Sequence, residues 1–403
     1  DALPILDQIY ITDIKIDHVR HLKNIEIPLS ENHMKHLIIT GKNGSGKTSL
    51  LDALARYIYL ITRPDYFNEQ TIECENLYPA DVGFGKNNLY KIEQRSKDEK
   101  GTSKRLLVYE KEISLQKTGV VIQFNELAEN TSSLFSQGKF VTAYYKADRI
   151  FKAQIPQHVE MVTLKKDYSI EETPRQDFVK YLLDLKMTQA LAVTGGKKEK
   201  AEQIAAWFKN FDDLLKRIFD DDSVELVFDE ETFQFTIHMN DRDSFDFNTL
   251  SSGYAAVLDI VVDLIIRMES QSDRKFDFSV AGIVLIDEIE THLHLELQRK
   301  ILDLLTSIFP NIQFILSTHS PFIINSVDNA VIYDLEKNLL VENGLSDVPY
   351  AGIVEGYFNS NEMSMLLQKK FNRYKELVNK EKLTDEDYDE ISELEMYLNE
   401  IPD

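Results

Sequence analysis

The chain has 403 residues, 43% of them apolar, which is enough for one large globular domain or two ordinary ones with a sizeable core. Its formal net charge of -23 argues against a broad electrostatic attraction to nucleic acid or to an anionic membrane. A single cysteine, Cys74, excludes an intramolecular disulfide framework and a cysteine-rich zinc site. No apolar run approaches the roughly 20 residues of a membrane-spanning helix. We expect a soluble, cytoplasmic protein.

Residues 1–62 are expected to form the N-terminal half of an α/β head. The stretches "IYITDIKIDHV" and "LKNIEIPL" alternate as strands do, and "HLIITG" reads as a buried strand. That third strand runs directly into the glycine-rich "GKNGSGKTS", and "LLDALARYIYLI" then has helical spacing. The sequence therefore predicts a strand, loop and helix unit.

Residues 63–245 are expected to form an inserted lobe. The strand-like pieces "LYKIEQ", "KRLLVYEKEISL" and "TGVVIQF" suggest antiparallel pairing, and "FVTAYYKADRI" resembles a core strand. Two segments with helical spacing follow, "FVKYLLDLKMTQALAV" and "AEQIAAWFKNFDDLLKRIF". The insert thus combines an antiparallel part and a helical part.

Residues 246–340 are expected to complete the head. An apolar helix after "LSSGY" is followed by the strand "VAGIVLIDE", a helix "LELQRKILDLLTSIF" and the strand "IQFILSTHS". Strands that alternate with helices predict a parallel sheet with crossover helices.

Residues 341–403 read as a charged helical tail. One apolar face holds Leu366, Leu367, Phe371 and Tyr374, and a second holds Ile391, Leu394 and Leu398. Packing onto the same chain and docking of a partner are equally compatible with this pattern.

The glycine-rich segment fits G-x-x-x-x-G-K-[ST] from Gly41 to Thr48. Backbone N–H groups of such a loop, at a helix N-terminus, form a cradle for phosphate oxygens. Lys47 would reach the terminal phosphates, and the Thr48 hydroxyl would bind Mg²⁺. The residues expected to bind ATP are Lys42, Asn43, Gly44, Ser45, Gly46, Lys47, Thr48 and Ser49.

Two acids follow the apolar strand of "GIVLIDE", Asp287 and Glu288. They would emerge at the carboxyl end of a parallel strand, where such sheets bind ligands. Asp287 is expected to hold Mg²⁺, and Glu288 to polarise the water that attacks the γ-phosphate. His319 in "ILSTHSPF" follows the next apolar strand and is expected to hydrogen-bond the γ-phosphate.

Two more histidines, His292 and His294, lie close to Glu290 in "ETHLHLELQ". A metal site is one interpretation of this cluster. The favoured interpretation is a loop and helix start beside the nucleotide.

The order of the phosphate loop, "LSSGY", "GIVLIDE" and "STHS" resembles that of ABC-type ATPases, and more closely the branch with SMC, RecF and OLD-like proteins. The resemblance covers the first fifty-odd residues and about 245–335. It implies a P-loop head of α/β class and an ATP molecule clamped between two heads. Ser251, Ser252 and Gly253 would then contact the ATP of a partner chain. A helix cap at "SSG" is compatible with this role, because a Ser can cap in the monomer and bind phosphate in the dimer.

Two departures limit the resemblance. Tyr254 stands where many ABC proteins have Gln or Glu. The glutamine with which family members sense Mg²⁺ is not identifiable, since Gln94 and Gln123 are both candidates.

Among family members, the chain resembles the stand-alone ATPase subunits of anti-phage defence systems of Septu, PARIS and retron type. That resemblance implies ATP and Mg²⁺ as cofactors, a homodimer or higher oligomer, and a separate nuclease or toxin effector. No intrinsic nuclease is expected, because the tail is too short for a TOPRIM domain. The alternative is a RecF-like or SMC-like ATP-dependent DNA-binding repair protein, for which residues 95–105, 165–168 and 195–200 are candidate basic segments.

Overall fold

The computed structural model describes residues 9–63, residues 117–345 except 127, 150, 157, 241, 273 and 343, and residues 365–378, 380, 384, 390–392 and 394. Cys74, Gln94 and the strands expected at 89–94 and 104–115 lie outside the described residues. The chain forms two compact units, Asp1–Ser346 and Asp347–Asp403. Each unit is taken by itself below.

A six-stranded sheet organises the first unit, with the order β11-β10-β3-β9-β8-β5. Every neighbouring pair is parallel except β10 and β11. Parallel strands put their carboxyl ends at one edge, so the segments after β3, β5, β8, β9 and β10 meet there. The strands are β3 (His36–Thr40), β5 (Phe140–Tyr145), β8 (Ala281–Ile286), β9 (Ile312–Ser317), β10 (Ala330–Asp334) and β11 (Leu339–Val341).

One face of this sheet is covered by α1 (Lys47–Thr62) and a three-stranded antiparallel sheet of order β2-β1-β4. Alternate residues of the main strands, such as Leu37, Ile39 and Leu285, join α1 and the smaller sheet in one buried core. The smaller sheet consists of β1 (Ile11–Val19), β2 (Leu22–Pro28) and β4 (Val120–Phe124), with α5 (Ala128–Ser136) beside α1.

The other face carries the alternating residues of the same strands, for example Ile38, Val284 and Leu316, which are fully buried. The apolar helix α8 (Ser252–Ser272) packs against β5 and against α9 (Leu295–Ile308). The sheet is therefore covered on both faces, as expected for strands with near-continuous apolar sequences. The expected α/β head is confirmed.

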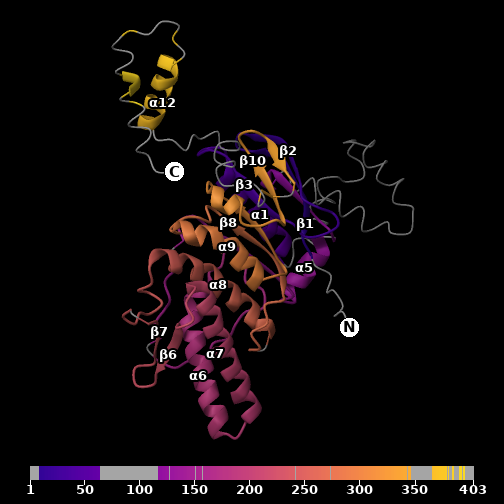
Figure 1. Ribbon diagram of the computed structural model, residues 1–403. Coiled ribbons are helices and arrows are strands. Elements are labelled where there is room, and N and C mark those ends of the chain that lie inside the picture. The colour runs from indigo at the N-terminus through magenta and orange to yellow at the C-terminus, as the bar shows by residue number, and fades with distance from the viewer. Residues whose placement is uncertain are drawn as a thin grey trace, which may run out of the picture. The chain divides into compact units, whose positions relative to one another are not determined.

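A helical hairpin of α6 (Phe178–Thr194) and α7 (Lys198–Phe219) extends away from the sheet (Figure 1). Its inner face is aromatic, with Trp207 stacked on Phe211 at 5.4 Å and edge-on to Tyr181 at 5.9 Å. The short helix η1 (Pro174–Asp177) leads into α6, and the ribbon of β6 (Glu225–Asp229) and β7 (Gln234–His238) follows α7.

The second unit contains α12 (Met365–Val378), in which Leu377 is buried. The Arg373 guanidinium donates to both carboxylate oxygens of Glu390, at 2.9 and 2.8 Å. This bidentate pair joins α12 to the residues beyond it. Across the part of the chain that is described, no helix is long and apolar enough to cross a membrane.

Candidate functional site

The phosphate loop joins β3 to α1 through three glycines with positive φ: Gly41 at 131°, Gly44 at 83° and Gly46 at 102°. These angles explain the glycines, because other residues rarely adopt them. A Cβ on Gly41 would also lie 2.8 Å from the Ser45 hydroxyl. The first turn of α1 contains no acid, so its dipole is left for an external anion.

Lys47, the first residue of α1, has a side chain folded back over the loop. Its ammonium donates to the carbonyls of Gly41 and Lys42, at 2.8 and 3.3 Å. Burial lowers the pKa of Lys47, and the carboxylates of Glu288 and Asp287 oppose that effect. The phosphate-loop lysine and the acidic pair therefore share one site.

The other expected ATP-binding residues divide by exposure. Lys42 and Asn43 are exposed, and the Lys42 ammonium lies 2.6 Å from the Glu336 carboxylate after β10. Ser45 and Ser49 are each 8% exposed. The Ser45 hydroxyl is buried and has no hydrogen-bond partner among the described residues, which leaves a polar group available in the loop.

Asp287 directly follows β8, and its carboxylate is held on both sides. Oδ2 accepts a hydrogen bond from the Thr48 hydroxyl at 2.8 Å, and Oδ1 accepts one from the Ser317 hydroxyl at 2.5 Å. Thr48 lies on α1, Asp287 directly follows β8, and Ser317 is the last residue of β9. The structure thus brings together Thr48 and Asp287, which the sequence assigns to Mg²⁺.

Glu288 adopts a left-handed conformation with φ of 44°, which is uncommon for a residue other than glycine. Its backbone N–H donates to the Ser317 hydroxyl at 2.8 Å. Ser317 therefore contacts both acids. Sequence reasoning gave no role to this serine, although it stands at the end of an apolar strand, where functional groups are expected.

His319 lies next to Glu290. The His319 backbone N–H donates to Glu290 Oε1 at 2.5 Å. His319 Nε2 and Glu290 Oε2 are both buried without a hydrogen-bond partner within the described part of the chain. Buried polar atoms are usually hydrogen-bonded, so these two atoms can accept a further polar partner.

The residues expected to contact the ATP of a partner chain, Ser251 to Gly253, are called the signature segment below and lie at the start of α8. Ser251 and Ser252 are exposed, and Gly253 is buried. Neither serine hydroxyl makes a hydrogen bond to another described residue, and the Ser251 carbonyl accepts from Ala255 at 2.9 Å. A Cβ on Gly253 would lie 3.3 Å from both the His292 carbonyl and His294 Nε2. Glycine allows α8 to approach the segment after the acidic pair.

Tyr254 joins this segment to the helical hairpin. Its ring lies 4.4 Å from the ring of Phe219, the last residue of α7, at 30°. Its hydroxyl lies 3.5 Å from the Phe219 carbonyl. The tyrosine therefore serves a contact within its own chain, which accounts for a residue that the sequence left unexplained.

The metal alternative at His292 and His294 finds no support, because no group of three or more His, Cys, Asp or Glu residues in the described ranges could hold a metal ion. Both histidines are exposed. Gln123 lies on β4 of the smaller sheet with an exposed side chain. On the side of β8 away from β9 lies β5, which contains no glutamine and is followed by Lys146.

Besides Ser317, two more residues missed by the sequence reasoning lie at the site. His21 Nε2 is 3.0 Å from the Ser45 carbonyl, and His21 lines a cavity of about 370 Å³ with Tyr333 and Leu335. Arg149 is 6% exposed and donates to the backbone carbonyls of Asp287 and Ile289. Of these two residues, only Arg149 had a signal in the sequence, because it follows the core strand in "YYKADR".

The parallel α/β head and the order of the motifs along the chain resemble those of ABC-type ATPases. Residues 168–325 match the family described as "AAA domain, putative AbiEii toxin, Type IV TA system". The matched residues include the signature segment, the acidic pair and His319, whose positions in the structure are described above.

The relatives that the chain resembles include a probable ATPase of a retron and a Septu protein. The chain is 32% identical to "Retron Ec83 probable ATPase" of Escherichia coli over 147 residues, 34% of this chain and 26% of that protein. It is 31% identical to "Septu protein PtuA" of Bacillus mycoides (strain KBAB4) over 137 residues, 34% of this chain and 18% of that protein. These matches span about a quarter or less of the relatives' length.

Among solved structures, the SMC head bound to the C-winged helix domain of ScpA is similar with a TM-score of 0.41 and 14% identity, over 84% of this chain and 98% of that one. The SMC head domain from Thermotoga maritima has a TM-score of 0.35 and 12% identity, over 81% and 94%.

Proposed function

We propose that this chain is an ATP-binding and ATP-hydrolysing regulatory subunit of a bacterial anti-phage defence complex, acting on a separate nuclease or toxin effector. The observation that carries the ATPase part is the hydrogen-bonded set of Thr48, Asp287 and Ser317 at one edge of the sheet, beside a phosphate loop whose carbonyls hold the Lys47 ammonium. The retron and Septu relatives support the defence assignment.

The residues at the site fit a nucleotide with Mg²⁺. The glycine loop and the uncompensated N-terminus of α1 suit phosphate oxygens, and the orphaned Ser45 hydroxyl offers a further contact. Thr48 and Asp287 would hold Mg²⁺, which neutralises phosphate charge when bound. Because Mg²⁺ keeps waters and phosphate oxygens as ligands, two protein ligands suffice.

Each remaining group has a role that follows from its place. Lys47 would release the Gly41 and Lys42 carbonyls and donate to the terminal phosphates. Glu288 would take the proton of the attacking water. His319, with an orphaned Nε2 held beside Glu290, would donate to the γ-phosphate. The cavity beside His21 is large enough to receive the nucleoside.

The trans part of the proposal rests on the start of α8. Ser251 and Ser252 are exposed at the N-terminus of a long helix and have no hydrogen bonds from their hydroxyls to described residues. A helix N-terminus with free hydroxyls favours an anion. In a two-fold dimer this segment would contact the γ-phosphate bound by the partner chain.

A mixing experiment tests the composite site. Ser251→Arg alone should block the trans contact, and Lys47→Ala alone should lose nucleotide binding, so each variant should be inactive. Mixed chains form heterodimers in which one of the two sites has an intact loop and an intact signature segment. The mixture should regain roughly a quarter of parental ATPase activity, because half of randomly formed dimers are mixed. A mixture as inactive as its parts would contradict the trans contact.

The effector part needs a separate experiment. A tagged Glu288→Gln chain should retain an effector, encoded beside it and co-expressed, in an ATP-dependent manner. The purified chain alone should not cut DNA in the presence of Mg²⁺. Cleavage by the chain alone would reject the regulatory role.

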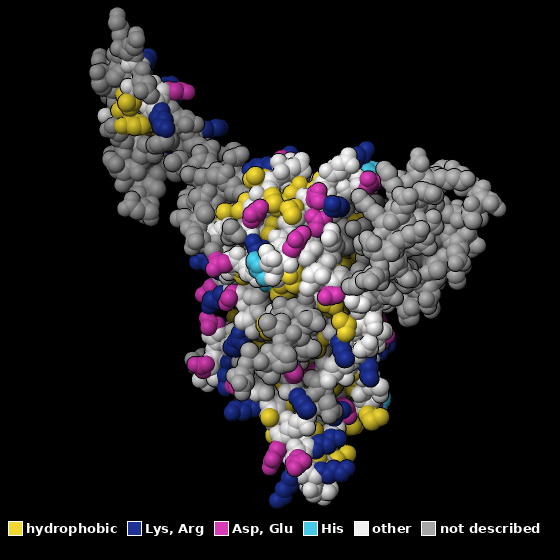
Figure 2. Space-filling model, turned by 90° about the vertical axis from the view of Figure 1, so that its right-hand side faces the viewer, with side chains coloured by type: hydrophobic (Ala, Val, Ile, Leu, Met, Phe, Trp, Pro, Cys, Tyr) yellow, Lys and Arg dark blue, Asp and Glu magenta, His cyan; other side chains and the backbone are white. Residues whose placement is uncertain are grey.

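A second candidate function, ATP-dependent DNA binding, is favoured by one surface. Lys197, Lys198 and Lys200 are exposed where α6 meets α7, and Lys and Arg side chains gather at that end of the molecule (Figure 2). Of the other basic segments, residues 95–105 lie outside the described residues, and Lys165 is paired with Glu172. Direct DNA binding predicts an affinity that falls steeply with salt, and a loss of it when the three lysines are changed to Glu.

A further inference from the structure

The turn that presents Glu288 is held by one arginine. Arg149 Nη1 donates to the Asp287 carbonyl at 3.0 Å, and Nη2 donates to the Ile289 carbonyl at 2.9 Å. These carbonyls flank Glu288, whose φ of 44° is the uncommon conformation in the turn. A planar guanidinium can grip two carbonyls in a fixed geometry. The contact therefore opposes relaxation of the strained residue.

Arg149 is itself buried. Its side chain is 6% exposed, and burial lowers its pKa. Among the charges that oppose this lowering, the carboxylate of Asp259 has the largest effect. The Nε of Arg149 is buried without a hydrogen-bond partner among the described residues. A buried guanidinium with an unused donor depends on the charges around it for its orientation.

Asp259 supplies one of those charges from α8. Its side chain is fully buried, and Oδ1 lies 2.5 Å from Nε of Arg175, at the η1 helix that precedes α6. The other oxygen, Oδ2, makes no hydrogen bond to any described residue. Burial raises the pKa of Asp259 to about 6, and the charge of Arg175 opposes this shift. Arg175 and Arg149 also line the same cavity of about 550 Å³.

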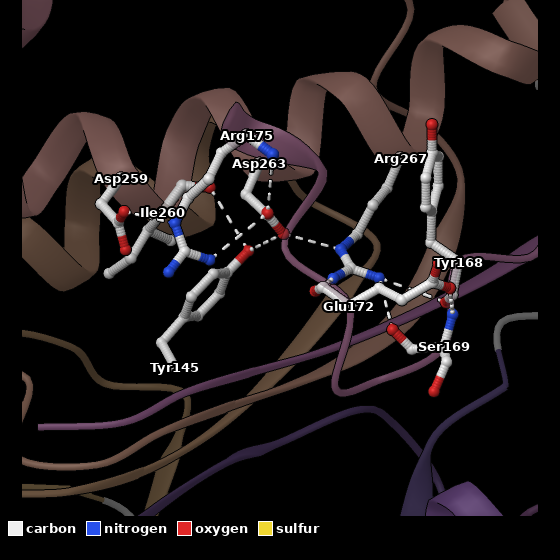
Figure 3. A network of polar contacts seen from close by, with 9 residues as sticks. All are labelled: Tyr145, Tyr168, Ser169, Glu172, Arg175, Asp259, Ile260, Asp263 and Arg267. Atoms are coloured by element: carbon white, nitrogen blue, oxygen red, sulfur yellow. Dashed lines mark hydrogen bonds and ion pairs between the residues drawn. The ribbon is translucent and has the colours of Figure 1, made fainter. Parts of the chain in front are cut away.

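Asp259 is the first member of a buried polar row on α8 (Figure 3). One turn further, Asp263 accepts from the Tyr145 hydroxyl at 2.9 Å and from Arg267 Nε at 2.7 Å. Tyr145 is the last residue of β5, and its carbonyl accepts from the Asp287 N–H at 2.8 Å. The row therefore ties α8 to the strand that borders the acidic pair.

The same helix starts at Ser252, about two turns before Asp259. A rigid helix carries a small displacement of its first turn to the buried row below it. The signature segment and Asp259, whose charge acts on Arg149, therefore lie on one helix.

We propose that Arg149 is a positioning residue for hydrolysis, which holds the turn that presents Glu288, and that the buried carboxylate of Asp259 on α8 supports the orientation of Arg149. The proposal rests on the proposed ATPase function and adds a residue that acts on the position of the general base. Arg149 acts through Glu288 and need not touch the nucleotide.

The first test separates binding from turnover in the full chain. Arg149→Met should lower kcat about 10²-fold and leave KM and nucleotide affinity within about threefold, because the base is misplaced while the phosphate loop is intact. Arg149→Lys keeps the charge but not the fork, so it should recover little of kcat. Arg149→Lys is also the variant to measure if Arg149→Met does not fold. Parental kcat in either folded variant would overturn the proposal.

The matched control is Asp184→Asn. Asp184 is similarly buried, and its carboxylate lies 2.6 Å from Arg274 in an ion pair on the hairpin side of α8. This variant should lower thermal stability without changing kcat. An equal loss of kcat would show that any lost buried charge has the same effect, and would overturn the assignment to Arg149.

The second test measures the coupling. Asp259→Asn should lower kcat in the parental background but add little in the Arg149→Met background, since the charge of Asp259 would act on hydrolysis through Arg149. The ATP-dependent dimer, measured in the Glu288→Gln background, should form as in the parent. Independent effects of the two substitutions, multiplying to the full product, would overturn the coupling.

The third test does not use ATP hydrolysis. In nucleotide-free protein, amide hydrogen exchange of residues 283–293 should be faster in Arg149→Met than in the parent and unchanged in Asp184→Asn. If the parental protein had no ATPase activity, the proposed function would be rejected. The exchange measurement would still show whether Arg149 holds the Glu288 turn. Unchanged exchange in Arg149→Met would reject the contact alone.

Discussion

The N-terminus of α1 at the phosphate loop and the N-terminus of α8 at the signature segment belong to the same head. Only at the first are the side chains hydrogen-bonded to other groups of their own chain. Lys47 and Thr48 are hydrogen-bonded to the loop and to Asp287, and Ser317 completes the set. Ser251 and Ser252 are exposed and their hydroxyls bond to no described residue.

This difference indicates how the two ends would work. A preorganised set binds nucleotide with little rearrangement, whereas an exposed anion site needs a partner to supply its ligand. We therefore expect changes at the first end to act within one chain, and changes at the second end to act only in the dimer. The predictions below test that division, from the largest expected effect to the smallest.

Glu288→Gln should slow ATP hydrolysis about 10²- to 10⁴-fold, because it removes the general base and keeps the shape of the side chain. Nucleotide affinity should stay near that of the parent, as measured by titration with a fluorescent ATP analogue. Single-turnover hydrolysis measures the loss. Turnover at the parental rate would mean that another residue is the base.

Lys47→Ala should weaken ATP binding about 10- to 100-fold in a single chain, since it deletes charge-assisted hydrogen bonds to the terminal phosphates. Calorimetric titration at a protein concentration below dimer formation checks this. Unchanged affinity would count against the phosphate-loop assignment and remove the contrast between the two ends.

Gly253→Ala should impair the dimer but not nucleotide binding by one chain. The added Cβ would lie 3.2 Å from Leu297 Cδ1 and 3.3 Å from the His292 carbonyl, so α8 must move by a few tenths of an ångström. We expect about 1 kcal/mol of lost stability and about tenfold weaker ATP-dependent dimerisation. Leu191→Ala, at a residue 72% exposed on the hairpin, is the control for both measurements.

The strand that carries the phosphate loop should lose stability in acid through His36. Burial lowers the pKa of His36 to about 4, and its Nδ1 accepts a hydrogen bond from the Phe314 N–H at 3.1 Å. The unfolded histidine binds a proton below pH 6.5 that the folded one does not, so stability is complete above this pH and falls below it. Urea unfolding should show a loss of about 2 kcal/mol at pH 5 relative to pH 7.5.

His36→Asn keeps an acceptor and does not titrate, so its stability should depend less on pH over this range. An equally steep loss in this variant would assign the acid sensitivity to other groups.

Much of the head could be predicted because its signals are local. Apolar strands followed by glycines, acids or histidine identify β3, β8 and β9, and parallel pairing then brings their carboxyl ends together. The strand β10, which pairs with β3 on its other side, was not expected, although "AVIYD" is a short apolar run. Runs of five residues carry little information without their neighbours.

The sequence by itself determined the class of the head, the phosphate loop and the acidic pair, because each depends on residue types at fixed spacing along the chain. Only the tertiary structure placed Arg149 against the Asp287 and Ile289 carbonyls, set Asp259 beside Arg175, and packed Tyr254 on Phe219. These contacts join residues from 35 to 140 positions apart. No periodicity or motif encodes such pairs, since they arise only when separate elements pack together.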